Sequence, residues 1–304
     1  MTLAQQMIVI SPAHGPAPLS AEQRELLVGK ARWTRTVFDA GFSTVPTICI
    51  TRAAWQALQD ERDKPVDRLR TAWVTTLFKL VNKGEDPPML VVRTSAIRHR
   101  AGLMGVKKDI VPPANEADSV ALRKPLGRAI QAAFDSYEKS EPVWAEHQSE
   151  NARNSQIVVI QATARGDIDL FMTRDEQSGR SGPAPLKGHP FPDLGNSAEE
   201  MKQMCELLDV ASGRHMVACV ARYKGKVQFI SARPTPVTAE ADLAAAVDRA
   251  EAGIWSTHQA VKSFNPARLP YILHPRLEAD KERKAIASGL GVSPGAASGK
   301  IVFA

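Results

Sequence analysis

The sequence has few cysteines and no long apolar segment. Its 304 residues include three cysteines (Cys49, Cys205 and Cys219), which lie far apart and form no CxxC pair. This spacing argues against a disulfide framework or a zinc finger and is typical of reduced thiols in the cytoplasm. No apolar run approaches the roughly 20 residues that cross a bilayer, and Met1–Ile10 lacks the pattern of a secretory signal. We therefore expect a cytoplasmic protein without a membrane segment.

The charge is moderately basic but is not concentrated anywhere. The formal net charge is +6 at pH 7, which suits an anionic cofactor, an acidic partner or nucleic acid. However, no run of five or six basic residues is present, and no aromatic RNA-binding signature is found. The composition therefore favours a nucleotide, a small anion or a protein partner over nucleic acid.

Helical and extended patterns alternate along the chain. A capping box at Ser20–Gln23 begins the first helical stretch, which runs to Phe38. The other predicted helices are 52–60, 65–83, 119–148, 197–210, 239–262 and 274–287, and the predicted strands are 45–50, 89–92, 156–161, 169–173, 216–221 and 227–232. This mixed order predicts α+β packing rather than a parallel doubly wound sheet.

The chain divides into three predicted parts: an N-terminal lobe over 1–95, a remainder over 96–238, and a helical extension over 239–304. The second part contains a loop from Glu176 to Asn196 with four glycines and four prolines. Loops of that length inside a compact domain are usually functional or disordered.

Four features have the chemistry to bind phosphate. They are the Gly29–Lys30 pair, Arg93 with Thr94 at the end of a strand, the basic segment Arg98–Arg100 before Gly102, and Arg233 after the strand 227–232. Guanidinium groups at strand ends suit anions. Each feature alone also has an ordinary interpretation as a solvated surface charge.

The order of these features resembles the ATP-grasp domain of the pyruvate, phosphate dikinase and phosphoenolpyruvate synthase family. The matching segments are Val28–Thr34, Gly41–Pro46, Val92–Ala96, Val158–Gln161, Phe171–Gly179, Ile230–Pro234, Leu273–Arg276 and Gly291–Phe303. The last segment is the most specific and resembles the entry strand of the family's phosphohistidine domain.

The resemblance implies an ATP-grasp-like fold of two lobes, with a C-terminal helical linker that leads to that truncated entry strand. It implies ATP as the cofactor and a swivelling phosphohistidine domain as a partner. The residues that it places at the nucleotide are Lys30, Arg93 and Arg233 on the phosphates, Gln161 at the adenine edge, and Thr94, Gly102, Arg174 and Asp175 at matched motif positions. The loop 98–105 is expected to close over the phosphates.

The sequence departs from the family at the metal site. The family's final hairpin is preceded by an Asp-Ile-Glu pair of carboxylates, whereas this chain has Val217-Ala-Cys219 there and Ser231 in place of a glutamine. Magnesium requires oxygen ligands, commonly one or two carboxylates plus phosphates. These changes argue against Mg²⁺ binding, unless other acids replace the pair (Asp167, Asp169, Asp175, Glu176 and Asp193 are the candidates). No metal ligand is therefore assigned.

The phosphate acceptor is also missing. None of the seven histidines lies in the family's Gly-Gly-x-Thr-Ser-His context, so no catalytic residue is assigned.

Two hypotheses follow. In the first, the chain is a pseudoenzyme, a nucleotide- or anion-binding module without MgATP chemistry. In the second, it is an active ATP-dependent phosphotransferase domain that passes phosphate to a histidine of a separate swivelling domain, for interconversion of pyruvate and phosphoenolpyruvate. If Ala304 is the natural end, we expect the strand 300–303 to pack back on the domain or to pair with another chain, because it otherwise exposes an edge.

Overall fold

The computed structural model describes residues 7–10, 19–60, 89–95, 107–111, 121–140, 156–162, 167–176, 178–191, 193–223, 226–274, 296 and 298–300. The predicted helix 65–83, most of the predicted helix 274–287 and residues 301–303 of the predicted tail strand lie outside these ranges. Within them, the residues cluster into two compact units, one of 1–173 with 182–235 and one of 174–181 with 236–304. The three-part division predicted from the sequence stays a prediction.

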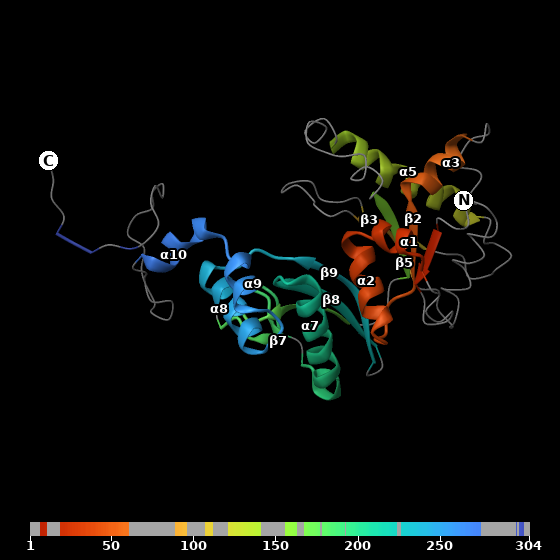
Figure 1. The fold of residues 1–304 in the computed structure, drawn as a ribbon. Helices are drawn as coiled ribbons and strands as arrows, with labels where there is room; N and C mark the ends of the chain where they lie inside the picture. Colours follow the sequence, from red (N-terminus) through yellow and green to blue (C-terminus); the bar gives the residue numbers. More distant parts are fainter. Residues whose placement is uncertain are drawn as a thin grey trace. The chain divides into compact units, whose positions relative to one another are not determined.

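The described residues form two antiparallel sheets with helices packed on them, which confirms the α+β class (Figure 1). The first sheet has the order β1-β2-β5-β3-β4 and the second has the order β7-β6-β8-β9. The strands of the first sheet are β1 (Met7–Ile10), β2 (Thr47–Thr51), β5 (Ile157–Ala162), β3 (Leu90–Ser95) and β4 (Lys107–Ile110), and those of the second are β7 (Ser181–Pro185), β6 (Asp167–Arg174), β8 (Met216–Tyr223) and β9 (Lys226–Pro234).

The central strands of the first sheet are buried on both faces. β-Branched residues dominate β2 and β5, and every residue of both strands is buried, as expected for strands that are covered on both sides. On one face, alternate residues such as Val92 and Ile160 pack with α3 (Arg52–Asp60) and α5 (Arg123–Ser140). On the other face, residues such as Val159 pack with α2 (Gly29–Asp39) and with Leu27, which follows α1 (Ala21–Leu26).

Helix α2 packs on both sheets. Ala31 and Phe38 belong to the core of the first sheet, whereas Trp33 and Val37 belong to the core of the second. A helix with apolar residues on two sides is buried between two layers. Because both sheets use it, α2 fixes how the strand ends of one sheet lie relative to the other.

The second sheet is covered by α7 (Ala198–Ser212). Its apolar residues recur at helical spacing: Met201, Met204, Cys205 and Leu208 are all fully buried. The helix ends at Gly213, whose φ of 63° is the left-handed conformation that favours glycine.

The two sheets are also joined directly. Phe229 of β9 exchanges main-chain hydrogen bonds with residues 43–45, which lead into β2: its N–H donates to Ser43 O (2.9 Å) and its O accepts from Val45 N (2.9 Å). Gln161 of β5 donates from Nε2 to Ile230 O of β9 (2.8 Å). The first unit is therefore one packed body rather than two independent sheets.

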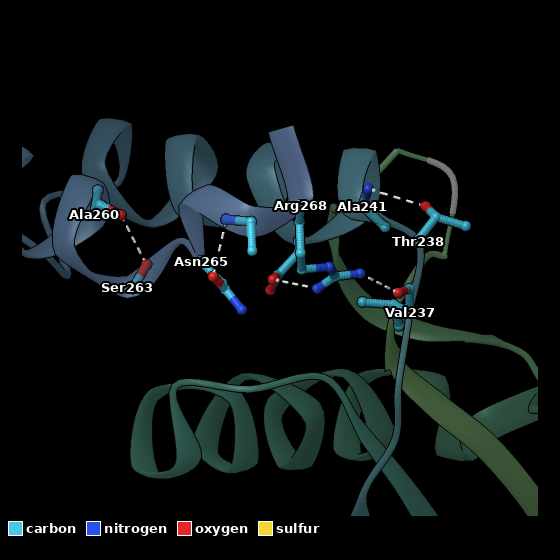
Figure 2. Close-up of polar contacts among 9 residues, drawn as sticks. Val237, Thr238, Ala241, Ala260, Ser263, Asn265 and Arg268 are labelled. Carbon is cyan, nitrogen blue, oxygen red and sulfur yellow. Dashed lines mark hydrogen bonds and ion pairs between the residues drawn. The ribbon is translucent and has the colours of Figure 1, made fainter. Parts of the chain in front are cut away.

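In the second unit, α8 (Ala239–Glu251), α9 (Thr257–Ser263), a 3₁₀ turn (Pro266–Arg268) and α10 (Leu269–Leu273) follow one another. Arg268 fastens the turn to α8, because its guanidinium donates to Asp242 (2.6 Å) and to the carbonyl of Val237 (Figure 2). Thr238 caps α8 by accepting from Ala241 N (3.2 Å). Arg268 and Thr238 therefore order the start of α8 from two sides.

Two predicted helices are interrupted in the structure. The stretch 20–38 divides into α1 and α2, because Leu27 and Val28 are extended and Gly29 has a φ of 55°. The stretch 239–262 divides into α8 and α9 at Gly253, whose φ is 69°, and a capping box at Ser256 starts the second helix. Periodicity alone does not register such breaks, since the apolar pattern continues across them.

Several strand and loop boundaries also differ from the prediction. The loop predicted at 176–196 contains β7, which pairs beside β6, and β4 lies where no strand was predicted. The helix predicted at 197–210 is α7, whose N-cap residue Ser197 makes no capping hydrogen bond with its side chain. The capping box at Ser20–Gln23 is confirmed by both of its hydrogen bonds (3.1 Å each). Among the described residues, no helix is long and apolar enough to cross a membrane.

Candidate functional site

The first turn of α2 is capped from a neighbouring strand. Val28 occupies the N-cap position and offers no side-chain hydrogen bond. Instead, the Ser95 hydroxyl at the end of β3 accepts from Ala31 N (3.1 Å) and donates to Val28 O (2.7 Å). A serine hydroxyl satisfies an unpaired N–H at a helix start in the same way when it comes from the N-cap itself.

Tyr137 of α5 holds Ser95 in place. Its hydroxyl accepts from Ser95 N (2.7 Å) and donates to Ile157 O of β5 (2.8 Å). Burial raises the pKa of Tyr137 above its ordinary value, and the hydrogen bonds act against that rise. The phenol therefore stays neutral and keeps the proton that it donates to Ile157.

Lys30 extends from this capped turn toward the end of β3. Its Nζ donates to the carbonyl of Thr94 (3.2 Å). Burial is the largest cause that lowers the pKa of Lys30 to about 8, and the nearby charges of Arg93 and Arg233 lower it further. The three cations predicted from the sequence to contact phosphate are therefore close enough to repel one another.

Arg93 lies on the α2 side of the first sheet. It pairs across the sheet with Val159, whose side chain belongs to the α2 side of the core. Burial lowers the pKa of Arg93, and Cys219 and Asp109 nearby act in the opposite direction. Its buried Nε has no hydrogen-bond partner among the residues described. This donor is also shielded from solvent.

The second sheet supplies the opposite wall. Across β8 and β9, Val217 pairs with Arg233 and Cys219 pairs with Ser231. Because Ala218 and Ala232, between them, face the α7 core, these two pairs lie on the other face of the sheet. The register therefore places Val217 and Cys219, the positions at which the resemblance calls for carboxylates, beside Arg233.

A cleft of about 1120 Å³ opens along the outer side of α2. Its lining includes both Lys30 and Arg233, and it is formed by α1, α2, the end of α7 and the end of β9. Cations outnumber acids in the lining: six basic side chains (Arg24, Lys30, Arg32, Arg35, Arg214 and Arg233) accompany Glu25 and Asp39. The volume lies slightly above the range of about 300–1,000 Å³ that is usual for small-molecule sites, and the charge suits an anionic ligand.

Gln161 takes part in the fold at this site. Its Nε2 bonds to Ile230 O and to Thr47 Oγ1 (3.3 Å), and the residue is only 1% exposed. Its Oε1 has no partner among the described residues. A buried acceptor without a donor costs about 1–3 kcal/mol, so this oxygen is a cost to the fold within the described residues.

The other residues predicted from the sequence are placed differently. Thr94 contributes its carbonyl, while its side chain shares the α5 face of β3 with Val92. Arg174 and Asp175 belong to the second unit, where Arg174 is fully buried against Gly179 O and Asp248, and Asp175 accepts from Ser178 N (2.6 Å) within a turn. Gly102 and the loop 98–105 lie outside the described residues.

Three of the five acids suggested as replacements for the missing carboxylates, Asp169, Asp175 and Asp193, have partners of their own. Asp169 pairs with Arg222 on β8, and Asp193 accepts from Gly195 N (3.1 Å). In the part of the chain that the structure describes, no group of three or more His, Cys, Asp or Glu side chains is arranged to hold a metal. Asp109 of β4 was not predicted: it pairs with Val91 and is close enough to act on Arg93. The sequence gave no pattern from which Asp109 could have been predicted, because β4 is too short to show an apolar periodicity.

Comparison with known proteins gives a partial match. No family model matches the chain. The chain is similar to pyruvate, phosphate dikinase of Rhizobium meliloti (44% identical over 80 residues, 26% of this chain and 9% of that enzyme) and to the chloroplastic enzyme of Mesembryanthemum crystallinum (33% over 108 residues, 34% and 11%). The matched segments thus span about a tenth of those enzymes, which agrees with the resemblance noted in the sequence.

Solved structures of similar fold include D-alanine–D-alanine ligase from Bacillus anthracis complexed with ATP (TM-score 0.36, 12% identity, covering 80% of this chain and 65% of that one). They also include the ATP-grasp ligase PsnB complexed with precursor peptide PsnA2 and AMPPNP (TM-score 0.31, 10% identity, 77% and 57%). Because these TM-scores lie below 0.5, nothing below depends on them.

The capping role of Ser95 predicts a large effect of its removal. The change Ser95→Ala leaves Ala31 N and Val28 O without partners in a buried place, so we expect it to lower the free energy of unfolding by about 2 kcal/mol. Chemical denaturation measures this. Ser20→Ala, at the exposed cap of α1, is the matched control and should cost about 1 kcal/mol or less. Equal losses in the two variants would show that Ser95 does not organise the site.

Proposed function

We propose that this chain is a nucleotide- or small-anion-binding module in which phosphate binding does not require magnesium. The observation that carries the proposal is the convergence of Lys30, Arg93 and Arg233 from α2, β3 and β9. Three cations of like charge in a partly buried place destabilise one another unless an anion joins them. The similarity to pyruvate, phosphate dikinase supports ATP as the nucleotide to test first.

The residues that share a face of the second sheet with Arg233 support the proposal that phosphate binding does not require magnesium. A metal between phosphates and protein needs hard oxygen ligands, and Val217 and Cys219 offer none. Without a metal, the protein's own cations must balance the phosphate charge. Phosphoryl transfer relies on metal ions to neutralise the charge that develops, so the proposal assigns binding to this chain rather than transfer.

A second function is favoured by one observation. Asp109 lies close enough to Arg93 to act on its pKa, and a carboxylate at the phosphates is what a magnesium ion would use. On that basis the chain is an ATP-dependent phosphotransferase domain that passes phosphate to a histidine on a separate swivelling domain. The two functions differ in whether binding needs the metal.

Calorimetric titration of ATP into the purified chain, with and without magnesium, distinguishes them. We expect binding in the absence of magnesium, weakened by about 1.5–3 kcal/mol in Lys30→Ala and in Arg93→Ala because each removes a charged hydrogen bond. Arg128→Ala, an exposed residue on α5, is the matched control and should leave the affinity unchanged. Binding that appears only with magnesium would favour the phosphotransferase. Unchanged affinity in both Lys30→Ala and Arg93→Ala would show that these residues do not bind the nucleotide.

The metal requirement should be inducible at one position. Cys219→Asp places a carboxylate beside Ser231 and near Arg93, so we expect ATP affinity to rise about tenfold or more when magnesium is added, whereas the parent protein shows no such gain. Cys219→Asn has the same size without the charge and serves as the control. A magnesium response of equal size in both variants would mean that position 219 does not face the bound phosphates.

Anion binding should depend on pH through Lys30. Its folded pKa of about 8 means that it loses its charge as the pH rises past 8, while a bound anion favours the charged form. ATP affinity should therefore be greatest below pH 8 and fall between pH 8 and 10, with proton uptake on binding near pH 8. Titration in buffers of different ionisation enthalpy measures that uptake.

Lys30→Arg provides the control for the pH prediction, because arginine keeps its charge throughout this range. In that variant, the affinity should stay constant between pH 8 and 10. A fall of the same size in Lys30→Arg would assign the pH dependence to another group.

A further inference from the structure

The cleft along α2 reaches beyond the cations of the proposed site. Among the described residues, its lining includes Lys30 and Arg233 but not Arg93. The rest of the lining supplies three further exposed arginines, namely Arg24 of α1, Arg32 of α2 and Arg214, which follows α7. The cleft therefore joins two of the predicted phosphate contacts to cations that the resemblance did not indicate.

The guanidinium groups of the exposed arginines are not used by the fold. Within the described ranges, no hydrogen bond or ion pair is made by the side chains of the four exposed arginines in the lining (Arg24, Arg32, Arg214 and Arg233). The guanidinium of Arg32 lies over the ring of Trp33, with its carbon 5.1 Å from the ring centroid. Each of the four groups thus keeps its N–H donors for solvent or for a ligand, and their fork geometry suits phosphate.

The acids in the lining offset little of this charge. Asp39 is already paired with Arg35 (2.7 Å). Among the described lining residues, Glu25 is then the one remaining acid against the four exposed arginines and Lys30. Charges of one sign that line a cleft raise the local concentration of oppositely charged ligands, so the cleft favours a ligand with several negative charges.

The exposed ridge of α2 separates these cations into two groups. Arg32 lies on the ridge, because it is exposed while its neighbours Ala31 and Trp33 are buried in the cores of the first and second sheets. Arg24 belongs to α1, which leads into the first core through Leu27. On the other side of the ridge, the lining comes from the end of α7 and the end of β9, which belong to the second sheet and its cover.

The two groups of cations are therefore not gathered at one point. The first side of the ridge has Arg24, and the second has Arg214 and Arg233. A helix with its side chains is about 10–12 Å across, so a ligand that contacts both sides needs anionic groups at two separate places. A nucleotide with all its phosphates in one chain presents them at one place.

We propose that the cleft selects nucleotides whose phosphates are divided between two positions, of the nucleoside 3′,5′-bisphosphate class, over nucleotides with a single phosphate chain. One phosphate contacts Lys30 and Arg233, and the other contacts Arg24 and Arg32 on the far side of the ridge. This inference rests on the proposed function, because it names the ligand class of the same site.

ATP and adenosine 3′,5′-bisphosphate are matched probes for this selection. Both contain adenosine and carry about four negative charges at about pH 7.5, since the second ionisation of a phosphate monoester lies near pH 6. Calorimetric titration of each nucleotide into the full chain without magnesium measures both affinities. The bisphosphate should bind about tenfold more tightly or better, which is the gain that one additional charged hydrogen bond provides.

The variants assign that gain to the far side of the ridge. Arg24→Gln and Arg32→Gln should each weaken binding of the bisphosphate by about tenfold and leave the affinity for ATP unchanged. Arg128→Gln, on α5 and outside the cleft, is the control and should change neither affinity. Equal melting temperatures of the variants and the native chain show that the substitutions leave the fold intact.

The outcomes separate the ligand class from the proposed function. Equal affinities for the two nucleotides, or a preference that persists in both Arg24→Gln and Arg32→Gln, overturns the ligand class, even when ATP binds and its binding depends on Lys30. Preferred binding of the bisphosphate that is lost in these variants supports it. A chain that binds neither nucleotide rejects both the ligand class and the nucleotide function.

Discussion

The site depends on the hydroxyl group of Ser95. It ends β3, the strand that carries Arg93, and it closes the first turn of α2, the helix that carries Lys30. A helix whose own N-cap is valine needs such a partner, because its first N–H groups are otherwise unsatisfied. Tyr137 fixes the serine main chain in turn, so the two cations are set by one chain of hydrogen bonds that runs from α5 to α2.

The second constraint is the double packing of α2. One side of the helix is part of the first core and the other side part of the second, so the ends of β3 and β9 approach each other around its N-terminal turn. Arg233 reaches Lys30 only because of this arrangement. The bonds of Phe229 to Ser43 and Val45 hold the two sheets together at another point, which leaves little freedom for the cations to separate.

Much of this arrangement could be predicted from the sequence and some could not. The hairpin of β8 and β9 follows from two apolar strands around a Gly-containing turn. The pairing of Cys219 with Ser231 does not, because it also depends on a register shift between Cys219 and Val220 that the sequence pattern does not indicate. The break before Gly29 was missed because Leu27 and Val28 continue an apolar helical pattern. In the structure, Val28 O accepts instead from the hydroxyl of Ser95, 67 residues away. Asp109 and the role of Tyr137 were missed for the same reason, since both act through contacts distant in the sequence. Arg174 matches a family motif, but the sequence could not show that its guanidinium contacts Gly179 O and Asp248 instead of a ligand.

The electrostatics of the site explain why it suits a ligand rather than the fold alone. Desolvation and like charges together bring the pKa of Lys30 from 10.5 to about 8, which means that the folded chain bears a cost for keeping that lysine charged at neutral pH. In a metal-assisted site, carboxylates would offset part of the cation charge. Val217 and Cys219, which share a face of the second sheet with Arg233, carry no such carboxylate. Under the proposal above, a bound anion would offset the like charges, and a ligand that binds the folded state alone stabilises it.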